Sequence, residues 1–382
     1  MKRKIKVHVV GTHGVPARYG GFETLADFLC QYLEPEFEIT VYCNANKYPK
    51  KRKSYFGATL KYLKLEANGL KGIFYDLITY THALLKADVI LYLSPVGSGF
   101  MTPLKYLTDT KVIINHGGLN EWEREKLSGL QRKFAKFNHK IASHHSDVNI
   151  ADNQLYQQSL KDNFDADSIV IRYGGNHANR IAPDDPRFAS KYPFVGHERY
   201  AVSVSRAQVD NNLHLVLKAF ESFRDYKLVL IANWEVSDYG KELKEKYKDQ
   251  PNMILLDAIY DKEELDYIRG NAHVYIHSHS RCGTAPSLVE AMNLGCAVVS
   301  YDVPTNRETT HDKAVFFTDA ASLIEQLDQL DEAAIELNRW YMKGIASNEY
   351  TWEAVSDQYR ELILTLEGVK HAVRLGSSSS SQ

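Results

Sequence analysis

Short apolar runs of strand length alternate with segments of helical periodicity, and this alternation occurs twice along the chain. The first series extends from residue 4 to about 173, and the second from 199 to about 318. Strands that alternate with helices form parallel sheets covered by those helices. The pattern therefore predicts an α/β protein with two Rossmann-like units.

The expected strands are rich in Val, Ile, Leu and aromatic residues, which is typical of strands buried on both faces. In the first series they lie at residues 6–10, 37–43, 59–65, 88–93, 111–115, 147–151 and 168–172. Expected helices of this series lie at residues 22–33, 72–86 and 123–145. In the second series the strands lie at residues 199–205, 227–232, 252–257, 273–279, 296–301 and 314–318.

Residues 174–198 separate the two series and are rich in Gly, Pro and Asp, which favour turns. We therefore expect an N-terminal domain over residues 1–173, a linker over 174–198 and a second domain over 199–350. An amphipathic helix is expected at residues 351–367, and the serine-rich tail at 375–382 is expected to be disordered.

The composition excludes several classes of protein. Hydrophobic residues make up 44% and charged residues 25% of the 382 residues, as in globular chains of two domains. The net charge of -2 gives no overall attraction to nucleic acid, and the four cysteines form no CxxC pair. No apolar run reaches the ~18 residues of a membrane span, and the N-terminal run is too short for a signal peptide. We expect a cytoplasmic protein.

A glycine-rich loop, GTHGVPARYGG, follows the first expected strand and leads into a helix. Glycines such as Gly20 and Gly21 let backbone N–H groups approach a phosphate or a sugar. The spacing differs from the G-x-G-x-x-G of dinucleotide-binding proteins, which disfavours a nicotinamide-dependent oxidoreductase. A tight turn without a ligand is the alternative interpretation.

Arg206 and His116 each follow an expected strand, at the sheet edge where open α/β sheets bind ligands. Arg206 is placed to meet a phosphate, and the alternative is a solvated arginine paired with Asp210. His116 is placed to contact a sugar hydroxyl or a leaving group, and the alternative is a structural histidine.

Two histidine pairs, at residues 144–145 and at 277 and 279, are candidate metal ligands. No third ligand accompanies either pair at a convincing sequence spacing. We therefore expect a solvated or core role for these histidines, and no metal site.

The segment RCGTAPSLVEAMNLGCAVVS, residues 281–300, predicts a loop, a helix that begins at Pro286 and a buried strand. Backbone N–H groups of residues 284–288 would face an anion at the N-terminus of this helix. Glu290 follows one turn later. It either accepts hydrogen bonds from ribose hydroxyls or only complements the helix dipole.

Residues 47–64 combine positive charge and aromatic rings without an acidic residue. Such a patch can contact an anionic membrane surface or an acceptor diphosphate, and a solvated loop is the alternative. A nucleic-acid partner is disfavoured because no recognised binding module accompanies the patch. The residues expected to make the contact are Lys50, Lys51, Arg52, Lys53 and Tyr55.

Taken in order, these segments resemble the GT-B glycosyltransferases of family 4. Residues 283–308, GTAPSLVEAMNLGCAVVSYDVPTNRE, are similar to the family signature G-x-x-L-x-E-A-M-x-x-G-x-P-V. The GGFE of residues 20–23, the IRYGGN of 171–176 and the strand–arginine–helix segment around Arg206 also fall at family landmarks. The N-terminal loop GTHGVPARYGGFET resembles the branch of bacterial rhamnosyltransferases that assemble cell-surface polysaccharides.

The resemblance implies two Rossmann-like domains facing a cleft, with the helix at 351–367 crossing back to the N-terminal domain. The second domain would bind a nucleotide sugar, best matched by dTDP-rhamnose, and the first a lipid-linked saccharide acceptor. Transfer would retain the anomeric configuration at the inner face of the cell membrane. It would need no cofactor and no metal, since no DxD carboxylate pair is placed in the crevice.

The resemblance also implies roles for single residues. Arg206 would neutralise the donor diphosphate, Glu290 would hold the ribose, and His116 would touch the reacting sugar. The other expected donor-site residues are Gly20, Gly21, Asn211, Cys282, Thr284, Ala285, Pro286, Ser287 and Leu288, with Ile259 and Tyr260 flanking the base.

Two positions depart from the family pattern. Asn211 stands where the family has a lysine, and Cys282 stands where it has a glutamate. The site therefore lacks one positive charge and one sugar-binding carboxylate, which suits a 6-deoxy sugar with fewer hydroxyls. The same departures favour the alternative function, a non-catalytic GT-B subunit that binds a nucleotide.

Overall fold

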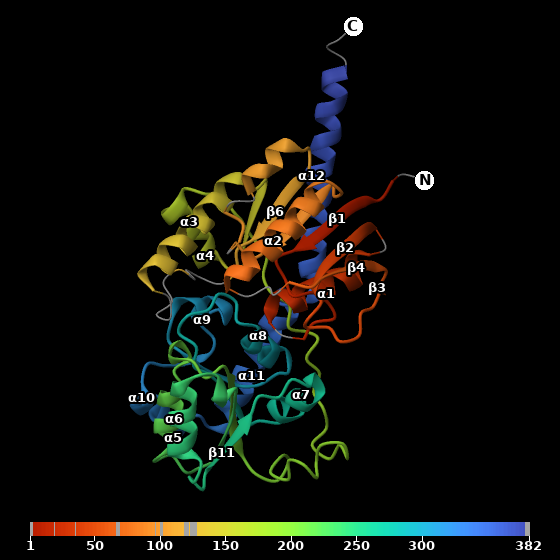
Figure 1. Cartoon of the computed structure of the whole chain (residues 1–382). Helices are drawn as coiled ribbons and strands as arrows, with labels where there is room; N and C mark the ends of the chain where they lie inside the picture. Colours follow the sequence, from red (N-terminus) through yellow and green to blue (C-terminus); the bar gives the residue numbers. More distant parts are fainter. Residues whose placement is uncertain are drawn as a thin grey trace. The chain divides into compact units, whose positions relative to one another are not determined.

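The computed structural model describes residues 3–18, 20–34, 36–65, 69–95, 97–99, 102–117, 122 and 128–378. The chain divides into two compact units (Figure 1). Unit 1 comprises Met1–Ile171 with Glu353–Gln382, and unit 2 comprises Arg172–Trp352.

Unit 1 contains an eight-stranded sheet in the order β3-β4-β2-β1-β5-β6-β7-β8. Neighbouring strands are parallel except for β3 and β4, which form an antiparallel hairpin. β1 is central, and its Val7 lies opposite Ile39 on one side and Val89 on the other. The strands are β1 (Ile5–Val10), β2 (Phe37–Asn44), β3 (Ser54–Tyr55), β4 (Ala58–Leu63), β5 (Val89–Leu93), β6 (Lys111–Asn115), β7 (Val148–Ala151) and β8 (Ile169–Val170).

Two helices of unit 1 begin after a side-chain cap, Ser128 for α3 and Asn153 for α4. α3 begins at Gly129 because the Ser128 hydroxyl accepts from the Gln131 N–H and the Gln131 side chain accepts from the Ser128 N–H. The helices are α1 (Gly21–Leu33), α2 (Gly69–Leu84), α3 (Gly129–His145), α4 (Gln154–Phe164) and α12 (Trp352–Ser378).

Unit 2 contains a six-stranded parallel sheet in the order β11-β10-β9-β12-β13-β14. The strands are β9 (Tyr200–Ser205), β10 (Lys227–Ala232), β11 (Met253–Asp257), β12 (Val274–His277), β13 (Val298–Tyr301) and β14 (Val315–Phe317). The helices are α5 (Leu213–Phe220), α6 (Asp238–Tyr247), α7 (Lys262–Gly270), α8 (Pro286–Asn293), α9 (Pro304–Thr309), α10 (Ala320–Gln329) and α11 (Glu332–Glu349).

Both faces of the unit 2 sheet are buried. Along β10, Val229 and Ile231 belong to one apolar cluster, while Leu228 and Leu230 belong to another. Because successive strand residues point to opposite faces, the two clusters lie on opposite sides of the sheet. Burial on both faces explains why these strands are apolar throughout rather than alternating.

The final helix belongs to unit 1 from Glu353 onward, as the family resemblance implied. Within that unit, Asn115 at the end of β6 donates to the Tyr359 hydroxyl at 2.8 Å, and Tyr32 donates to the Glu353 carboxylate at 2.6 Å. The helix is drawn in blue in Figure 1. It continues to Ser378, past the predicted end at residue 367 and into the tail that was expected to be disordered.

The segment 174–198 differs from the expected linker. It belongs to unit 2 and packs against its core through Ala178, Tyr192, Phe194 and Val195, which are buried. Gly and Pro in this segment produce turns, but its aromatic side chains still need an apolar environment.

Each strand expected from the sequence is present in the structure, with ends shifted by a few residues at most. The sequence did not predict β3, a two-residue strand whose turn contains Phe56 and Gly57 at positive φ. Within the described residues, no helix combines the length and the hydropathy needed to cross a bilayer.

Candidate functional site

Arg206 directly follows β9 at the carboxyl end of the unit 2 sheet. Its side chain is exposed, and within the described ranges it forms no salt bridge, so the predicted alternative partner Asp210 does not pair with it. Beside it, Ser205 Oγ lies 2.9 Å from His279 Nε2. Arg206 therefore offers an uncompensated positive charge at the edge where α/β sheets bind ligands.

Asn211 fixes the backbone around Arg206. Its amide donates to the Arg206 carbonyl at 2.8 Å, and its own carbonyl accepts from the Ser278 hydroxyl at 2.6 Å. The side chain is 4% exposed. Asn211 thus positions the loop after β9, and direct contact with a donor stays a prediction.

Helix α8 begins at Pro286, as predicted, with Ala285 as the N-cap and no side-chain cap. Pro286 has no N–H group, and the Leu288 N–H donates to the Ala285 carbonyl at 3.0 Å. Two of the five residues expected to present N–H groups to an anion, 284–288, are therefore not available for that role. Thr284 is buried, while Ser287 is partly exposed at the helix start.

Glu290 lies one turn into α8, and each oxygen of its carboxylate has a partner. Its Oε2 accepts from Arg269 Nη1 at 2.7 Å, and its Oε1 lies 3.2 Å from His177 Nε2. Burial alone would raise the pKa of Glu290, but the Arg269 charge and the His177 hydrogen bond outweigh it and lower the pKa to about 2. Its side chain is 17% exposed, so lone pairs of an ionised carboxylate remain accessible to a hydroxyl group.

The partners of Glu290 are themselves held in place. Arg269 is 2% exposed and also donates to Asp266 Oδ1 at 2.8 Å. Trp352 Nε1 donates to His177 Nδ1 at 2.9 Å, which leaves the proton of the ring on Nε2 facing Glu290. This network orients the carboxylate that the sequence suggested as the ribose contact.

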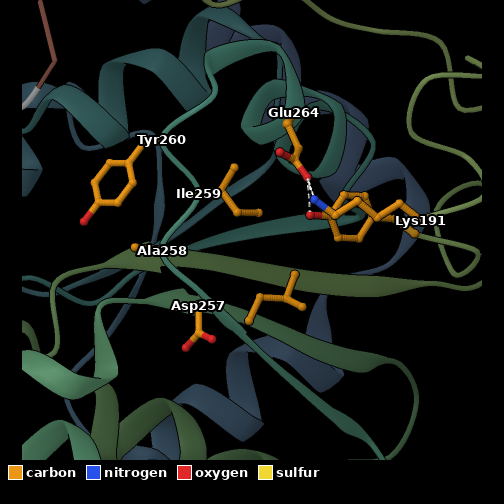
Figure 2. Close-up of a pocket in the computed structure, with 8 residues that line it drawn as sticks. Lys191, Asp257, Ala258, Ile259, Tyr260 and Glu264 are labelled. Carbon is orange, nitrogen blue, oxygen red and sulfur yellow. Dashed lines mark hydrogen bonds and ion pairs between the residues drawn. The ribbon is translucent and has the colours of Figure 1, made fainter. Parts of the chain in front are cut away.

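A pocket of about 290 Å³ lies beyond the carboxyl end of β11. Figure 2 shows Ile259 between the Tyr260 ring and the ion pair of Lys191 with Glu264. The Glu264 carboxylate also accepts a hydrogen bond from the Tyr192 hydroxyl at 2.5 Å. The predicted base-flanking residues Ile259 and Tyr260 both line this pocket, and their contact with a base stays a prediction. The lining residues are Lys191, Tyr192, Leu256, Asp257, Ala258, Ile259, Tyr260 and Glu264.

Cys282 lies beside the two histidines of β12 and its following loop. Its Sγ is 4.0 Å from His277 Nε2 and 3.7 Å from Asn306 Oδ1. One ligand atom of each of His277, His279 and Cys282 lies within 4.8 Å of the others. Burial, followed by the charge of Arg206, lowers the pKa of His279 to about 3. The third ligand that the sequence spacing did not reveal is therefore present in space.

In unit 1, the glycine-rich loop uses its polar groups internally. Glu23 of α1 accepts from the Thr12 hydroxyl at 3.1 Å and from the His13 N–H at 2.9 Å. Gly20 has φ 103° and lies against this carboxylate, since an added Cβ would be 2.7 Å from Glu23 Oε2. Gly21 begins α1. These contacts favour the tight-turn interpretation for this part of the loop.

His116 lies in the interior of unit 1 rather than at an exposed strand end. It is 1% exposed, its Nε2 donates to Asn149 Oδ1 at 2.8 Å, and its Nδ1 faces His139 Nδ1 at 3.5 Å. Burial lowers the pKa of His116 to about 4, so the ring is neutral near pH 7. These contacts favour the alternative interpretation, a structural histidine, and contact with a reacting sugar stays a prediction.

The predicted basic patch is exposed along residues 50–53. In the described part of the chain, none of Lys50, Lys51, Arg52 and Lys53 forms a salt bridge. Tyr55 is instead tied to the fold, because its hydroxyl donates to Asp27 Oδ1 at 2.9 Å. The patch keeps its charge free, and Tyr55 anchors the hairpin beneath it.

Sequence reasoning missed four side chains around this site: Arg269, His177, Lys191 and Tyr192. Lys191 and Tyr192 lie in the expected linker, residues 174–198, where the aromatic residues were the one signal of packing. Arg269 lies within α7 at a position that helical periodicity would bury, which was the available signal.

Two family models match the chain, each over less than half of it. Residues 184–346 match the family described as glycosyl transferases group 1, and residues 4–176 match a domain of unknown function, DUF1972. No curated protein is similar enough in sequence to match.

Solved structures of low sequence identity share the fold. Sucrose-phosphate synthase from Thermosynechococcus elongatus is 15% identical, with a TM-score of 0.81 over 96% of this chain and all of its own. A glycosyltransferase from Rickettsia africae is 14% identical, with a TM-score of 0.73 over 96% of this chain and 99% of its own. Anabaena HepE in complex with UDP and glucose is 14% identical, with a TM-score of 0.73 over 95% of this chain and all of its own. The chain therefore has the GT-B fold, and its residues 184–346 are a glycosyl transferases group 1 domain.

Proposed function

We propose that this protein is a retaining glycosyltransferase that moves L-rhamnose from dTDP-rhamnose onto a lipid-linked saccharide in cell-surface polysaccharide synthesis. The group 1 domain supports glycosyl transfer from a nucleotide sugar. The family 4 and rhamnosyltransferase assignments rest on the motif resemblance, above all on the N-terminal loop.

The observation that carries the proposal is the arrangement of the sheet edge in unit 2. Arg206 follows β9, and the pocket beside Ile259 and Tyr260 follows β11, two strands away. Neighbouring strands are about 4.8 Å apart, so these groups are separated by about 10 Å along the edge. That spacing suits a nucleotide with its base in the pocket and its diphosphate at Arg206.

The chemistry assigned to the site is stabilisation of the leaving group. Negative charge grows on the departing diphosphate oxygen as its bond to the sugar breaks. The Arg206 guanidinium would pair with the diphosphate and stabilise this charge. Glu290, ionised and held by Arg269, would accept hydrogen bonds from the ribose hydroxyls. The acceptor hydroxyl would attack on the face from which the diphosphate leaves, which retains the anomeric configuration.

The choice of a 6-deoxy sugar follows from Cys282. A carboxylate at this position could hold two sugar hydroxyls, whereas a thiol is a weak hydrogen-bonding group. HepE has been solved with UDP-glucose, so a GT-B neighbour binds a nucleotide sugar, and dTDP and UDP differ little in size. We assign a 6-deoxy sugar as the donor sugar because Cys282 and Asn211 replace the glutamate and the lysine of the family pattern, which leaves fewer charged groups to bind sugar hydroxyls.

The acceptor and the place of the reaction are assigned to unit 1. The free charges of Lys50, Lys51, Arg52 and Lys53 suit the phosphate groups of a lipid-linked acceptor or an anionic lipid surface. The protein would then act as a peripheral protein at the inner face of the cell membrane. No nucleic acid is involved in this proposal.

A transfer assay tests the proposed activity. Purified protein is incubated with dTDP-rhamnose, or with UDP- and GDP-sugars, and lipid-linked acceptors, and the products are analysed by mass spectrometry and by NMR of the new linkage. We expect one deoxyhexose to be added with retained configuration, and activity without added Mg²⁺ or Mn²⁺. Transfer of another sugar, or inversion, would reject the corresponding part of the proposal.

The second candidate is a non-catalytic nucleotide-binding subunit, which Asn211 and Cys282 favour. The Glu290→Ala variant separates the two candidates. Turnover that is present in the wild type and lost in the variant excludes the subunit, whereas nucleotide binding without turnover supports it.

A further inference from the structure

The C-terminal end of β12 and the loop after it bring together three side chains that bind transition metals. His277 is the last residue of β12, and His279 follows two residues later in the loop. The rings are 4.4 Å apart between centroids. Cys282 returns to them after the turn at residues 280–281. We propose that His277, His279 and Cys282 form a zinc site.

The spacing of the three groups is close to that of a tetrahedral site. Zn–S bonds of about 2.3 Å and Zn–N bonds of about 2.0 Å place sulfur and nitrogen about 3.6 Å apart in a tetrahedron. Cys282 Sγ and His277 Nε2 are 4.0 Å apart, and the three ligand atoms lie within 4.8 Å of one another. Small rotations of these side chains would close the site, and the thiol proton would pass to solvent.

The donor set selects the metal. Two imidazoles and a thiolate suit Zn²⁺, whereas Mg²⁺ and Ca²⁺ prefer oxygen ligands. Three protein ligands leave a fourth position for water. This site is distinct from a carboxylate site for Mg²⁺ or Mn²⁺. It shares Cys282 with the proposed donor site, but its test detects the bound metal and not glycosyl transfer, so the two proposals can fail separately.

The surroundings orient the ligands, as second-shell groups do in zinc proteins. Ser205 Oγ lies 2.9 Å from His279 Nε2, which leaves the other ring nitrogen of His279 for the metal. Asn306 donates to the His279 carbonyl at 2.9 Å and so fixes the backbone that carries this ligand. Its Oδ1 accepts from the Cys282 thiol at 3.7 Å, a contact that is lost when the thiol proton leaves.

The His277 ring lies in the interior of unit 2. It is 1% exposed, and its Nε2 is the ring nitrogen that faces the Cys282 sulfur. A metal at this cluster would tie the loop before α8 to the end of β12, and so fix the start of that helix.

Cobalt substitution gives the most direct test, because Co²⁺ bound by a thiolate has a charge-transfer band in the near ultraviolet. The reduced, chelator-treated full chain without an affinity tag is titrated with Co²⁺. We expect each chain to bind one Co²⁺ and to show this band. The band should disappear when Zn²⁺ is added, because Zn²⁺ replaces Co²⁺. The band should disappear in Cys282→Ser, and affinity should fall at least about tenfold in His279→Gln.

The control variant is His144→Gln, which removes an exposed histidine from the pair at 144–145 and should leave the band and the affinity unchanged. A wild type without the band, a band that persists in Cys282→Ser, or equal loss in His144→Gln would overturn the proposal.

Alkylation of the wild type provides a second test that needs no variant. Cys282 is partly exposed, whereas Cys30, Cys43 and Cys296 are buried. Zn²⁺ should slow modification of Cys282 by iodoacetamide at least about tenfold, as measured by peptide mass spectrometry. It should also raise Tm by about 5 °C at a hundred times its Kd. An unchanged rate of alkylation would contradict the site.

Discussion

Arg269 donates to Glu290 at 2.7 Å across the space between α7 and α8. The same guanidinium donates to Asp266 at 2.8 Å and is 2% exposed. A cation buried between two carboxylates keeps Glu290 ionised and fixes the direction of its side chain. The ionised, fixed carboxylate is what the proposed ribose contact of Glu290 requires.

Replacement of Arg269 should destabilise unit 2 strongly. Arg269→Met leaves Glu290 and Asp266 without their cation, and removal of one partner from a buried ion pair costs about 3–5 kcal/mol of unfolding free energy. Urea denaturation followed by tryptophan fluorescence measures the loss. Arg199→Met is the matched control, because its exposed salt bridge with Glu332 contributes about 0–1 kcal/mol. Similar losses in both variants would show that the buried network is not stabilising.

Glu290 should make the stability of unit 2 depend on acidic pH. Its pKa is about 2 in the folded protein, below the ordinary glutamate value of 4.5, so folding favours the ionised form. The resulting stabilisation, about 3 kcal/mol, is present above pH 4.5 and is lost as pH falls toward 2. Burial raises the pKa of Asp266, so the contribution of Asp266 to stability decreases as the pH rises, opposite to that of Glu290.

The comparison of wild type with Glu290→Gln isolates the Glu290 contribution. The unfolding free energy of the variant, measured from pH 6 to pH 2.5, should fall less steeply than that of the wild type. Parallel curves would mean that the Glu290 carboxyl titrates equally in the folded and unfolded chain.

Gly174 should tolerate no side chain. A Cβ at this position would lie 2.5 Å from Cδ2 of Trp352, a residue that is 1% exposed and hydrogen-bonded to His177. Gly174→Ala should therefore cost about 1–3 kcal/mol through overpacking. Gly344→Ala is the control, because a Cβ there meets nothing within 4 Å and should stabilise α11 by about 0.5–1 kcal/mol. Thermal unfolding should show shifts of opposite sign, and equal shifts would argue against close packing at Gly174.

His116 should affect stability rather than chemistry. His116→Ala removes a buried ring and the hydrogen bond to Asn149, so the unfolding free energy should fall by about 2 kcal/mol or more. His144→Ala, at an exposed position, should change it by less than about 0.5 kcal/mol. Activity per folded molecule should stay unchanged in both variants. A loss of kcat with unchanged stability in His116→Ala would restore a catalytic role.

The fold could be predicted because it depends on local patterns. Buried parallel strands such as β5 and β10 are continuous apolar runs, and the helices between them keep an apolar stripe, so the alternation is visible residue by residue. The hairpin strand β3 was not predicted, because two residues are too short to show any pattern.

The candidate site could be predicted only in part. Arg206 and Pro286 were identified because strand ends and helix starts have local signals. The partners of Glu290 could not be identified from the sequence. Arg269 and His177 lie 21 and 113 residues from Glu290 along the chain, and they contact it only because of tertiary packing. The burial of His116 was missed for the same reason, because α3 supplies His139 beside it.

Calorimetric titration of the full chain with dTDP, UDP, GDP and their sugars tests the central claim most directly, because a nucleotide-sugar site in unit 2 must bind at least one of them. We predict that a dTDP-linked 6-deoxy sugar binds with 1:1 stoichiometry. Arg206→Ala should abolish this binding, and Arg199→Ala, at the opposite end of β9, should leave it unchanged. Absence of binding by every nucleotide, or equal binding by Arg206→Ala and the wild type, would contradict the account.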